Sequence, residues 1–136
     1  MANDNLLWAN RIGTRQYLGE NTRGATVKIG MGDGEFTPGE LFKLALGTCQ
    51  ALSADHTLSS KLGADFEATV TVNSEKHESE ERYTHISSQI ITDLTALDEN
   101  ELTKLLERVA SAIDKNCTVG HSLKNGVDYE YTLENE

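Results

Sequence analysis

The most constraining feature of this sequence is a long predicted helix that is apolar on nearly all of its sides. Thr37 is a good N-cap, Pro38 occupies the first helical position and Glu40 lies three residues after the cap. Gly63 ends the pattern. A helix that is apolar all round needs other elements to cover it, so we predict a fold built around this one. The apolar residues of its first turns are Leu41, Phe42, Leu44, Ala45 and Leu46.

Three short extended segments precede this helix, at 7–12, 16–20 and 25–29, and glycines and polar residues separate them. They predict an antiparallel meander. After the helix, apolar and polar residues alternate over 66–72 and again over 86–94, which predicts two paired strands.

A second helix is predicted to begin near Asp98, where Glu101 completes a capping-box pattern before apolar residues at helical spacing as far as Ile113. A turn or short helix follows, and then a last strand with Val127 and Tyr129 on one face, continued by Tyr131 and Leu133. The order βββ-α-ββ-α-β predicts an α+β fold with antiparallel sheets.

The chain of 136 residues fits a single domain, 1–136. No apolar run approaches the ~18 residues of a membrane span. The first ten residues, MANDNLLWAN, lack the basic start and apolar stretch of a signal peptide. We therefore expect a cytoplasmic protein.

The charge balance limits the partners. Asp and Glu number 22 against 12 Lys and Arg, which gives a formal charge of -10. An acidic surface repels phosphate groups, so we expect neither nucleic acid nor an anionic membrane as a partner.

The two cysteines, Cys49 and Cys117, are the main candidates for chemistry. Cys49 lies on the apolar stripe of the first helix and would serve equally well as a small core residue. Cys117 follows Ile113 by four residues, on the apolar face of the second helix. Two helices packed through these faces would bring both thiols together. A peroxide-reducing pair needs that arrangement, because one thiolate becomes a sulfenic acid and the other condenses with it.

A peroxidatic cysteine must ionise near neutral pH. Cys49 lies about three turns into its helix, beyond the reach of the helix dipole, so a cation has to stabilise its thiolate. Arg15 and Arg23 lie in the meander that the first helix is expected to pack against, although a surface role suits any single arginine as well.

A zinc site is a rival interpretation. Cys49, His56, Cys117 and His121 would form a Cys₂His₂ set. Cys49 and His56 are two helical turns apart, about 10.5 Å along the axis, which is too far for one ion unless the helix breaks.

Three segments resemble the OsmC/Ohr family, the osmotically inducible and organic hydroperoxide resistance proteins. FTPGELFKLALGTCQAL is similar to its central-helix motif, NCTVGHSLKNG to its second cysteine motif, and YLGENTRGATVKIG to the strand turn that carries its arginine. The order of elements matches as well, so the resemblance covers nearly the whole chain. It implies an OsmC-like fold, with antiparallel sheets around two central helices in an intertwined homodimer whose active site lies at the subunit interface.

The resemblance also implies roles for individual residues. Cys49 would be the peroxidatic cysteine and Cys117 the resolving one. Arg23 would stabilise the Cys49 thiolate and orient the peroxide, with Arg15 in reserve beside the substrate. The family's glutamate ten positions before the first cysteine is Gly39 here, so either the neighbouring Glu40 replaces it or Glu40 only caps the helix.

The second cysteine motif departs from the family at two further positions, where Thr118 replaces a common proline and Gly120 a common serine. Phe36, Phe42 and Leu46 would line an apolar pocket together with residues of the partner subunit.

The function implied is a thiol peroxidase that reduces organic hydroperoxides, holds no bound cofactor and is regenerated by an external dithiol of the lipoyl type. The alternative within the family is a non-catalytic or weakly active stress protein that binds an apolar ligand.

Overall fold

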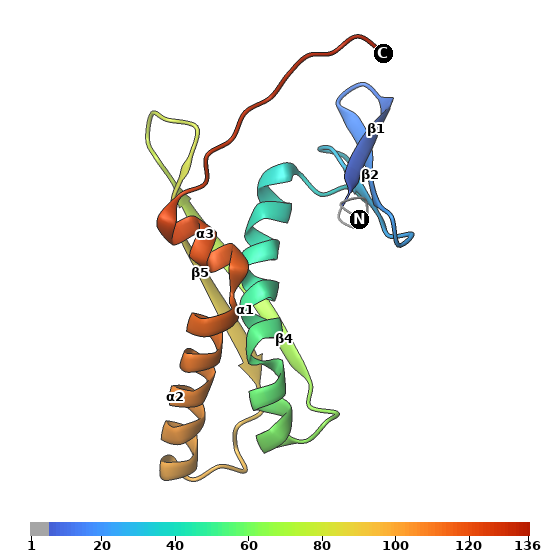
Figure 1. Ribbon diagram of the computed structural model, residues 1–136. Helices are drawn as coiled ribbons and strands as arrows, with labels where there is room; N and C mark the ends of the chain where they lie inside the picture. Colours follow the sequence, from blue (N-terminus) through green and yellow to red (C-terminus); the bar gives the residue numbers. More distant parts are fainter. Residues whose placement is uncertain (1–5) are drawn as a thin grey trace. The chain divides into compact units, whose positions relative to one another are not determined.

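The computed structural model describes residues 6–136. The chain divides into two compact units, of which one ends at Leu44 and the other spans Ala45–Glu136. The elements along the chain (Figure 1) are β1 (Leu7–Gly13), β2 (Gln16–Asn21), β3 (Thr26–Ile29), α1 (Pro38–Leu62), β4 (Ala68–Lys76), β5 (Tyr83–Thr92), α2 (Glu99–Asn116) and α3 (Thr118–Asn125).

The first unit contains the predicted meander. β1, β2 and β3 form an antiparallel sheet in that order, with Trp8 opposite Glu20 and Leu18 opposite Lys28. Each observed strand lies within about one residue of its predicted bounds. A parallel bridge between Ile29 and Phe36 then brings the chain back beside β3 before α1 begins.

The predicted start and end of α1 are confirmed. The Glu40 amide donates to Thr37 Oγ1 at 3.1 Å, and the Thr37 amide donates to Glu40 Oε1 at 2.8 Å, which completes a reciprocal capping box. Gly63 follows the last helical residue with φ of +106°, a left-handed conformation that glycine adopts without strain.

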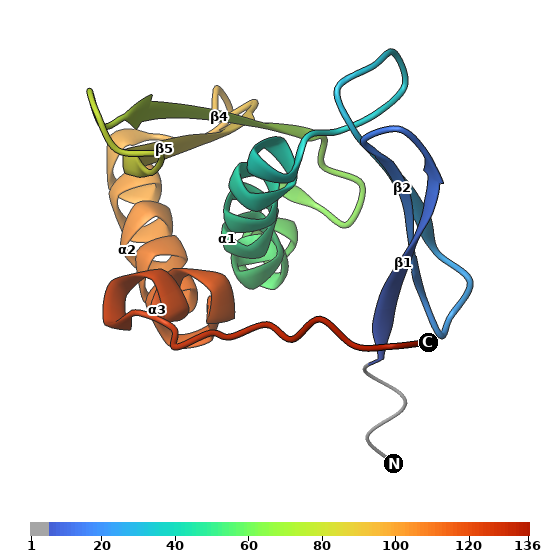
Figure 2. The same ribbon diagram turned by 90° about the horizontal axis from the view of Figure 1, so that it is seen from above.

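The second unit is built on the β4–β5 hairpin. α1 and α2 lie side by side on one of its faces (Figures 1 and 2). The buried centre of this packing is Ala54, Leu58 and Leu105. Where α1 ends, Lys61 Nζ lies 2.7 Å from Glu101 Oε2 at the start of α2. Partly buried residues around that centre are Leu62, Phe66, Ile90, Leu94, Leu97, Val109 and Ile113.

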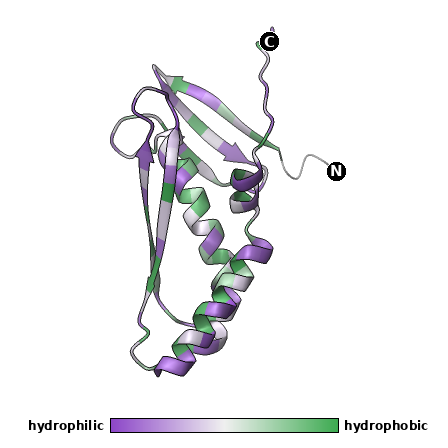
Figure 3. Cartoon of the chain, turned by 90° about the vertical axis from the view of Figure 1, so that its left-hand side faces the viewer, coloured by the Kyte–Doolittle hydropathy of each residue, from purple (hydrophilic) through white to green (hydrophobic). Residues whose placement is uncertain are grey.

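α2 begins as predicted. Asp98 is its N-cap and accepts the amide of Glu101 at 2.8 Å, while Glu101 Oε1 accepts the Asp98 amide at 3.2 Å. Hydrophobic and hydrophilic residues form alternating bands along the helices (Figure 3), as amphipathic helices require. Only one face of α2 therefore contributes to the core.

Two expectations differ from the structure. Residues 127–136 form no strand, and the side chains of Val127, Tyr129, Tyr131 and Leu133 are 65%, 89%, 92% and 98% exposed. A strand requires a neighbour for its backbone hydrogen bonds, and no strand within residues 6–136 pairs with this segment.

α1 is also not covered on nearly all sides, because Leu52 is 75% exposed and only one face meets the hairpin and α2. The α+β class with antiparallel sheets is confirmed.

None of the helices within residues 6–136 is long and apolar enough to cross a bilayer.

The packing of α1 on the hairpin depends on the lack of a side chain at Gly47. A Cβ built there would lie 2.7 Å from Val72 Cγ2 and 2.9 Å from Val70 Cγ1, both closer than real carbon contacts. The helix therefore approaches the strands at a distance that only glycine permits.

We predict that Gly47→Ala lowers the free energy of unfolding by about 1–2 kcal/mol, because overpacking outweighs the better helix propensity of alanine. Urea unfolding measures the change. Adding Val72→Ala to Gly47→Ala removes one clashing methyl and should recover part of the loss, with a coupling above about 0.5 kcal/mol. A Gly47→Ala protein as stable as the wild type would contradict this packing.

Candidate functional site

The second unit brings Cys49 and Cys117 together. Both are free thiols, and the side chain of Cys49 lies close enough to that of Cys117 to raise its pKa. Cys49 lies on α1 and is partly exposed, whereas Cys117 is buried, with 2% of its surface exposed. The predicted juxtaposition of the two helix faces therefore places a partly accessible thiol against a buried one.

Cys117 is held at the junction of two helices. It is the C-cap of α2, where its amide donates to Ile113 O at 3.0 Å, and also the N-cap of α3, where its carbonyl accepts the His121 amide at 2.9 Å. Its Sγ accepts the amide of Gly120 at 3.3 Å. The sulfur thus takes the place that a serine or threonine oxygen usually holds at a helix start.

The environment of Cys117 favours its neutral thiol. Burial raises the pKa of Cys117 most. The interaction with the neighbouring Cys49 side chain raises it further. The backbone amides of Gly120 and Val119 act in the opposite direction without overcoming the effect of burial. Cys117 therefore stays protonated at neutral pH.

Leu46 and Gly120 shape the space around the Cys117 sulfur. Leu46 is buried, and its Cδ1 would lie 3.9 Å from a Cβ built on Gly120. The same Cβ would lie 3.1 Å from Cys117 Sγ. The predicted pocket residue Leu46 is thus next to the cysteine pair, and glycine at position 120 leaves the sulfur uncrowded.

The zinc interpretation gains no support from the geometry. His121 Nε2 donates to Asp114 O at 2.5 Å, which ties α3 to the last turn of α2, and His56 is exposed on α1. Within residues 6–136, no group of three or more His, Cys, Asp or Glu side chains is placed to hold a metal ion.

Glu40 has a structural role in this chain. Its Oε1 accepts the Thr37 amide in the capping box of α1. Within the described residues no ion pair joins Glu40 to an arginine. Of the two roles considered for Glu40, helix capping is the one that the structure displays.

Arg23 is presented by the turn between β2 and β3. Asn21 Oδ1 accepts the amides of Arg23 at 2.9 Å and Ala25 at 3.0 Å, and its carbonyl accepts the Gly24 amide at 3.4 Å. Arg23 is exposed at the tip of this turn. Asn21 was not among the predicted residues, although asparagine two positions before Arg23 and glycine after it are typical of such a turn.

Arg15 and Phe36 also belong to the first unit. Arg15 is exposed in the β1–β2 turn with φ of +57°, a conformation that is uncommon for residues other than glycine. Glu35 Oε1 accepts the Gly32 amide at 2.8 Å and so shapes the loop before Phe36, which is 44% exposed. Phe42, in the second turn of α1, is 42% exposed.

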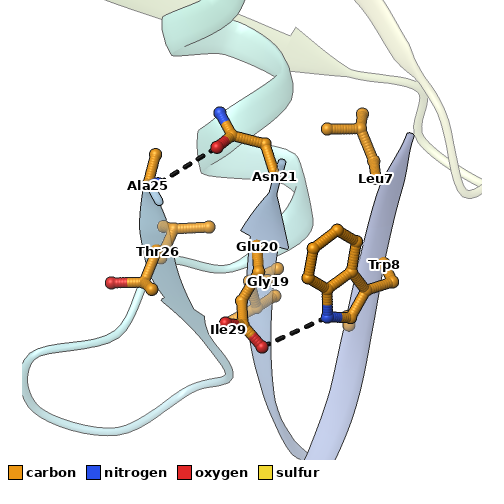
Figure 4. A pocket seen from close by; sticks show the side chains of 10 residues that line it. Leu7, Trp8, Gly19, Glu20, Asn21, Ala25, Thr26 and Ile29 are labelled. Atoms are coloured by element: carbon orange, nitrogen blue, oxygen red, sulfur yellow. Dashed lines mark hydrogen bonds between the residues drawn. The ribbon is translucent and has the colours of Figure 1, made fainter. Parts of the chain in front are cut away.

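A hollow on the first unit's sheet was not predicted. It encloses about 410 Å³, and Trp8 Nε1 donates to Glu20 Oε2 at 3.2 Å within it (Figure 4). Its walls are mainly apolar. The residues that line it are Leu7, Trp8, Ala9, Gly19, Glu20, Asn21, Ala25, Thr26, Val27 and Ile29.

Comparisons with known proteins place the chain in one family. Residues 30–132 match the family model described as OsmC-like protein. Uncharacterized proteins of Mycobacterium tuberculosis and Mycobacterium bovis are each 43% identical to it over 122 residues, which cover 88% of this chain and 89% of theirs.

Solved structures share the fold. A hypothetical protein from Aquifex aeolicus is 17% identical with a TM-score of 0.68, over 91% of this chain and 89% of that one. The organic hydroperoxide resistance protein OhrB of Bacillus subtilis is also 17% identical, with a TM-score of 0.54 over 90% of this chain and 92% of its own.

Proposed function

Because the chain belongs to the OsmC-like protein family, we propose that it is a thiol-dependent peroxidase that reduces organic hydroperoxides to alcohols. The observation that carries the proposal is the contact between two free thiols of unequal exposure, Cys49 and Cys117. A partly exposed thiol can meet a substrate, while a buried neutral thiol beside it is held ready for the second step.

The reaction proceeds in two steps on these sulfurs. The Cys49 thiolate attacks the distal peroxide oxygen, the O–O bond breaks, and the alkoxide leaves as the alcohol after taking a proton. Cys49 is then a sulfenic acid. Cys117 Sγ attacks the Cys49 sulfur, water leaves, and a disulfide joins the two residues. An external dithiol of the lipoyl type supplies two electrons to restore both thiols, and no bound cofactor takes part.

Arg23 is the cation that we propose for stabilising the Cys49 thiolate and orienting the peroxide, with Arg15 as its alternate. Its support is the turn that Asn21 builds, which leaves Arg23 exposed at the tip. Leu46 lies beside Cys117 and is proposed to contact the alkyl part of the substrate. Phe36 and Phe42 are proposed as further substrate contacts. Free thiols of this kind suit a reducing compartment such as the cytoplasm.

The alternative function is binding of an apolar ligand with little or no turnover. Gly39 offers no carboxylate, Glu40 is engaged in its cap, and the hollow on the β1–β2–β3 sheet is mainly apolar. The two functions differ in what happens to a peroxide, since only the peroxidase consumes it.

We predict that the fully reduced, metal-free protein consumes cumene hydroperoxide when dihydrolipoamide is supplied, and consumes hydrogen peroxide more slowly. Cys49→Ser should fall to the rate measured without protein. Cys117→Ser should complete a first turnover and accumulate a sulfenic acid that dimedone traps on Cys49. Absence of consumption by the wild type would reject the peroxidase and favour the ligand-binding alternative.

A further prediction concerns the cation. Arg23→Ala should slow alkylation of Cys49 by iodoacetamide at neutral pH roughly tenfold, because a nearby positive charge favours the thiolate. Arg15→Ala is the matched control and should change the rate little. An effect confined to Arg15→Ala would transfer the role to Arg15, and no effect from either variant would remove arginine from the mechanism.

We also propose that the protein acts as a homodimer. Residues 127–133 alternate apolar and polar side chains, as a strand does, yet their apolar side chains are 65–98% exposed. Both sheets have edge strands whose backbone groups are open to further pairing. A second copy of the chain that pairs with this segment would bury the apolar side chains and extend a sheet.

Light scattering on the wild-type protein should then give twice the 14.9 kDa of the chain. The double variant Tyr129→Glu, Tyr131→Glu should shift the equilibrium towards 14.9 kDa, because the new charges oppose burial. Glu130→Gln, on the other side of the segment, is the control and should leave the dimer intact. A monomeric wild type would contradict the proposal.

A further inference from the structure

The disulfide expected between Cys49 and Cys117 would be asymmetric. Cys117 has 2% of its surface exposed and lies among Leu46, Gly120 and the end of α2, whereas Cys49 is partly exposed on α1. Thiol–disulfide exchange begins when a thiolate reaches one sulfur of the bond, so access decides which sulfur is attacked. Access favours Cys49.

The departure of the other sulfur depends on what stabilises it. When the Cys49 sulfur is attacked, the electron pair of the S–S bond passes to Cys117 Sγ. That sulfur lies at the start of α3, where the Gly120 amide donates to it at 3.3 Å. A hydrogen bond to an ionised acceptor is about twice as strong as a neutral one, so the amide supports the thiolate more than the thiol.

The geometry points to a fixed direction of re-reduction: the external dithiol attacks Cys49 Sγ, and Cys117 leaves as a thiolate held by the Gly120 amide. This inference rests on the proposed peroxidase function. One sulfur of the dithiol forms a mixed disulfide with Cys49, and Cys117 takes up a proton. The second sulfur then attacks the first, which frees the Cys49 thiolate and leaves the reductant as a cyclic disulfide.

Gly120 serves this step in two ways. Its amide contacts the leaving sulfur, and its missing side chain leaves room, because a Cβ there would lie 3.1 Å from Cys117 Sγ. The burial that keeps Cys117 from the reductant also disfavours its charged form, so the amide offsets a cost that the site itself creates.

The direct test maps the first mixed disulfide on the wild-type chain. The reduced protein is oxidised with diamide and treated briefly with limiting 2-mercaptoethanol. The reaction is then stopped by unfolding the protein in acid with excess N-ethylmaleimide, which alkylates the freed thiol. Trypsin separates the cysteines into peptides 44–61 and 116–124. We expect the mercaptoethanol adduct on 44–61 and the alkyl group on 116–124.

The reverse labelling, equal labelling of both peptides, or failure of diamide to join them would each overturn the inference. Because diamide replaces the peroxide, this result is independent of the proposed function, whose own failure would appear as absent peroxide consumption.

A pair of variants tests the amide. Gly120→Pro removes the N–H and adds side-chain bulk, whereas Gly120→Ala adds bulk and keeps the N–H. We expect dithiothreitol to reduce the Gly120→Pro disulfide about three- to tenfold more slowly than that of Gly120→Ala, since leaving-group stability affects the exchange rate only in part. Equal rates in two folded variants would contradict the role of the amide. If circular dichroism shows Gly120→Pro unfolded, the wild-type peptide map decides.

Discussion

The junction between α2 and α3 is the feature on which the site depends. Cys117 ends α2 through its amide, begins α3 through its carbonyl, and receives the Gly120 amide on its sulfur. His121 strengthens the same junction, because its ring donates to Asp114 O. These bonds fix the sulfur where two helices meet, and Cys49 on α1 lies against it. We propose that this fixed position suits Cys117 to react with a sulfenic acid on Cys49.

The two cysteines differ in burial and in hydrogen bonding. Burial raises the pKa of Cys117 and favours its neutral thiol, and we propose that the Gly120 amide stabilises its thiolate when the disulfide opens. Cys49 is partly exposed on α1. The close packing at Gly47, two residues before Cys49, sets where α1 meets β4 and so where that thiol lies. One site can thus have a sulfur that meets other molecules and a sulfur that reacts only with its neighbour.

Local signals predicted most of the fold. The capping patterns at Thr37 and Asp98 set both helix starts, and helical spacing correctly placed Cys49 near Cys117. The last strand could not be predicted correctly, because its formation depends on a hydrogen-bonding neighbour that the described chain does not supply. The contacts of Asn21 and Gly120 depend on backbone amides, which residue types alone do not reveal. The catalytic roles of Arg23, Cys49 and Cys117 stay predictions.

In the proposed reaction, an organic hydroperoxide converts two thiols of one chain into one disulfide. Protein reduced under anaerobic conditions and treated with a single equivalent of cumene hydroperoxide tests it most directly, with intact-mass analysis and a non-reducing tryptic digest. We expect the loss of two hydrogens per chain and a disulfide that links peptides 44–61 and 116–124. An unchanged mass, or oxygen added at methionine with both cysteines still reduced, would contradict it.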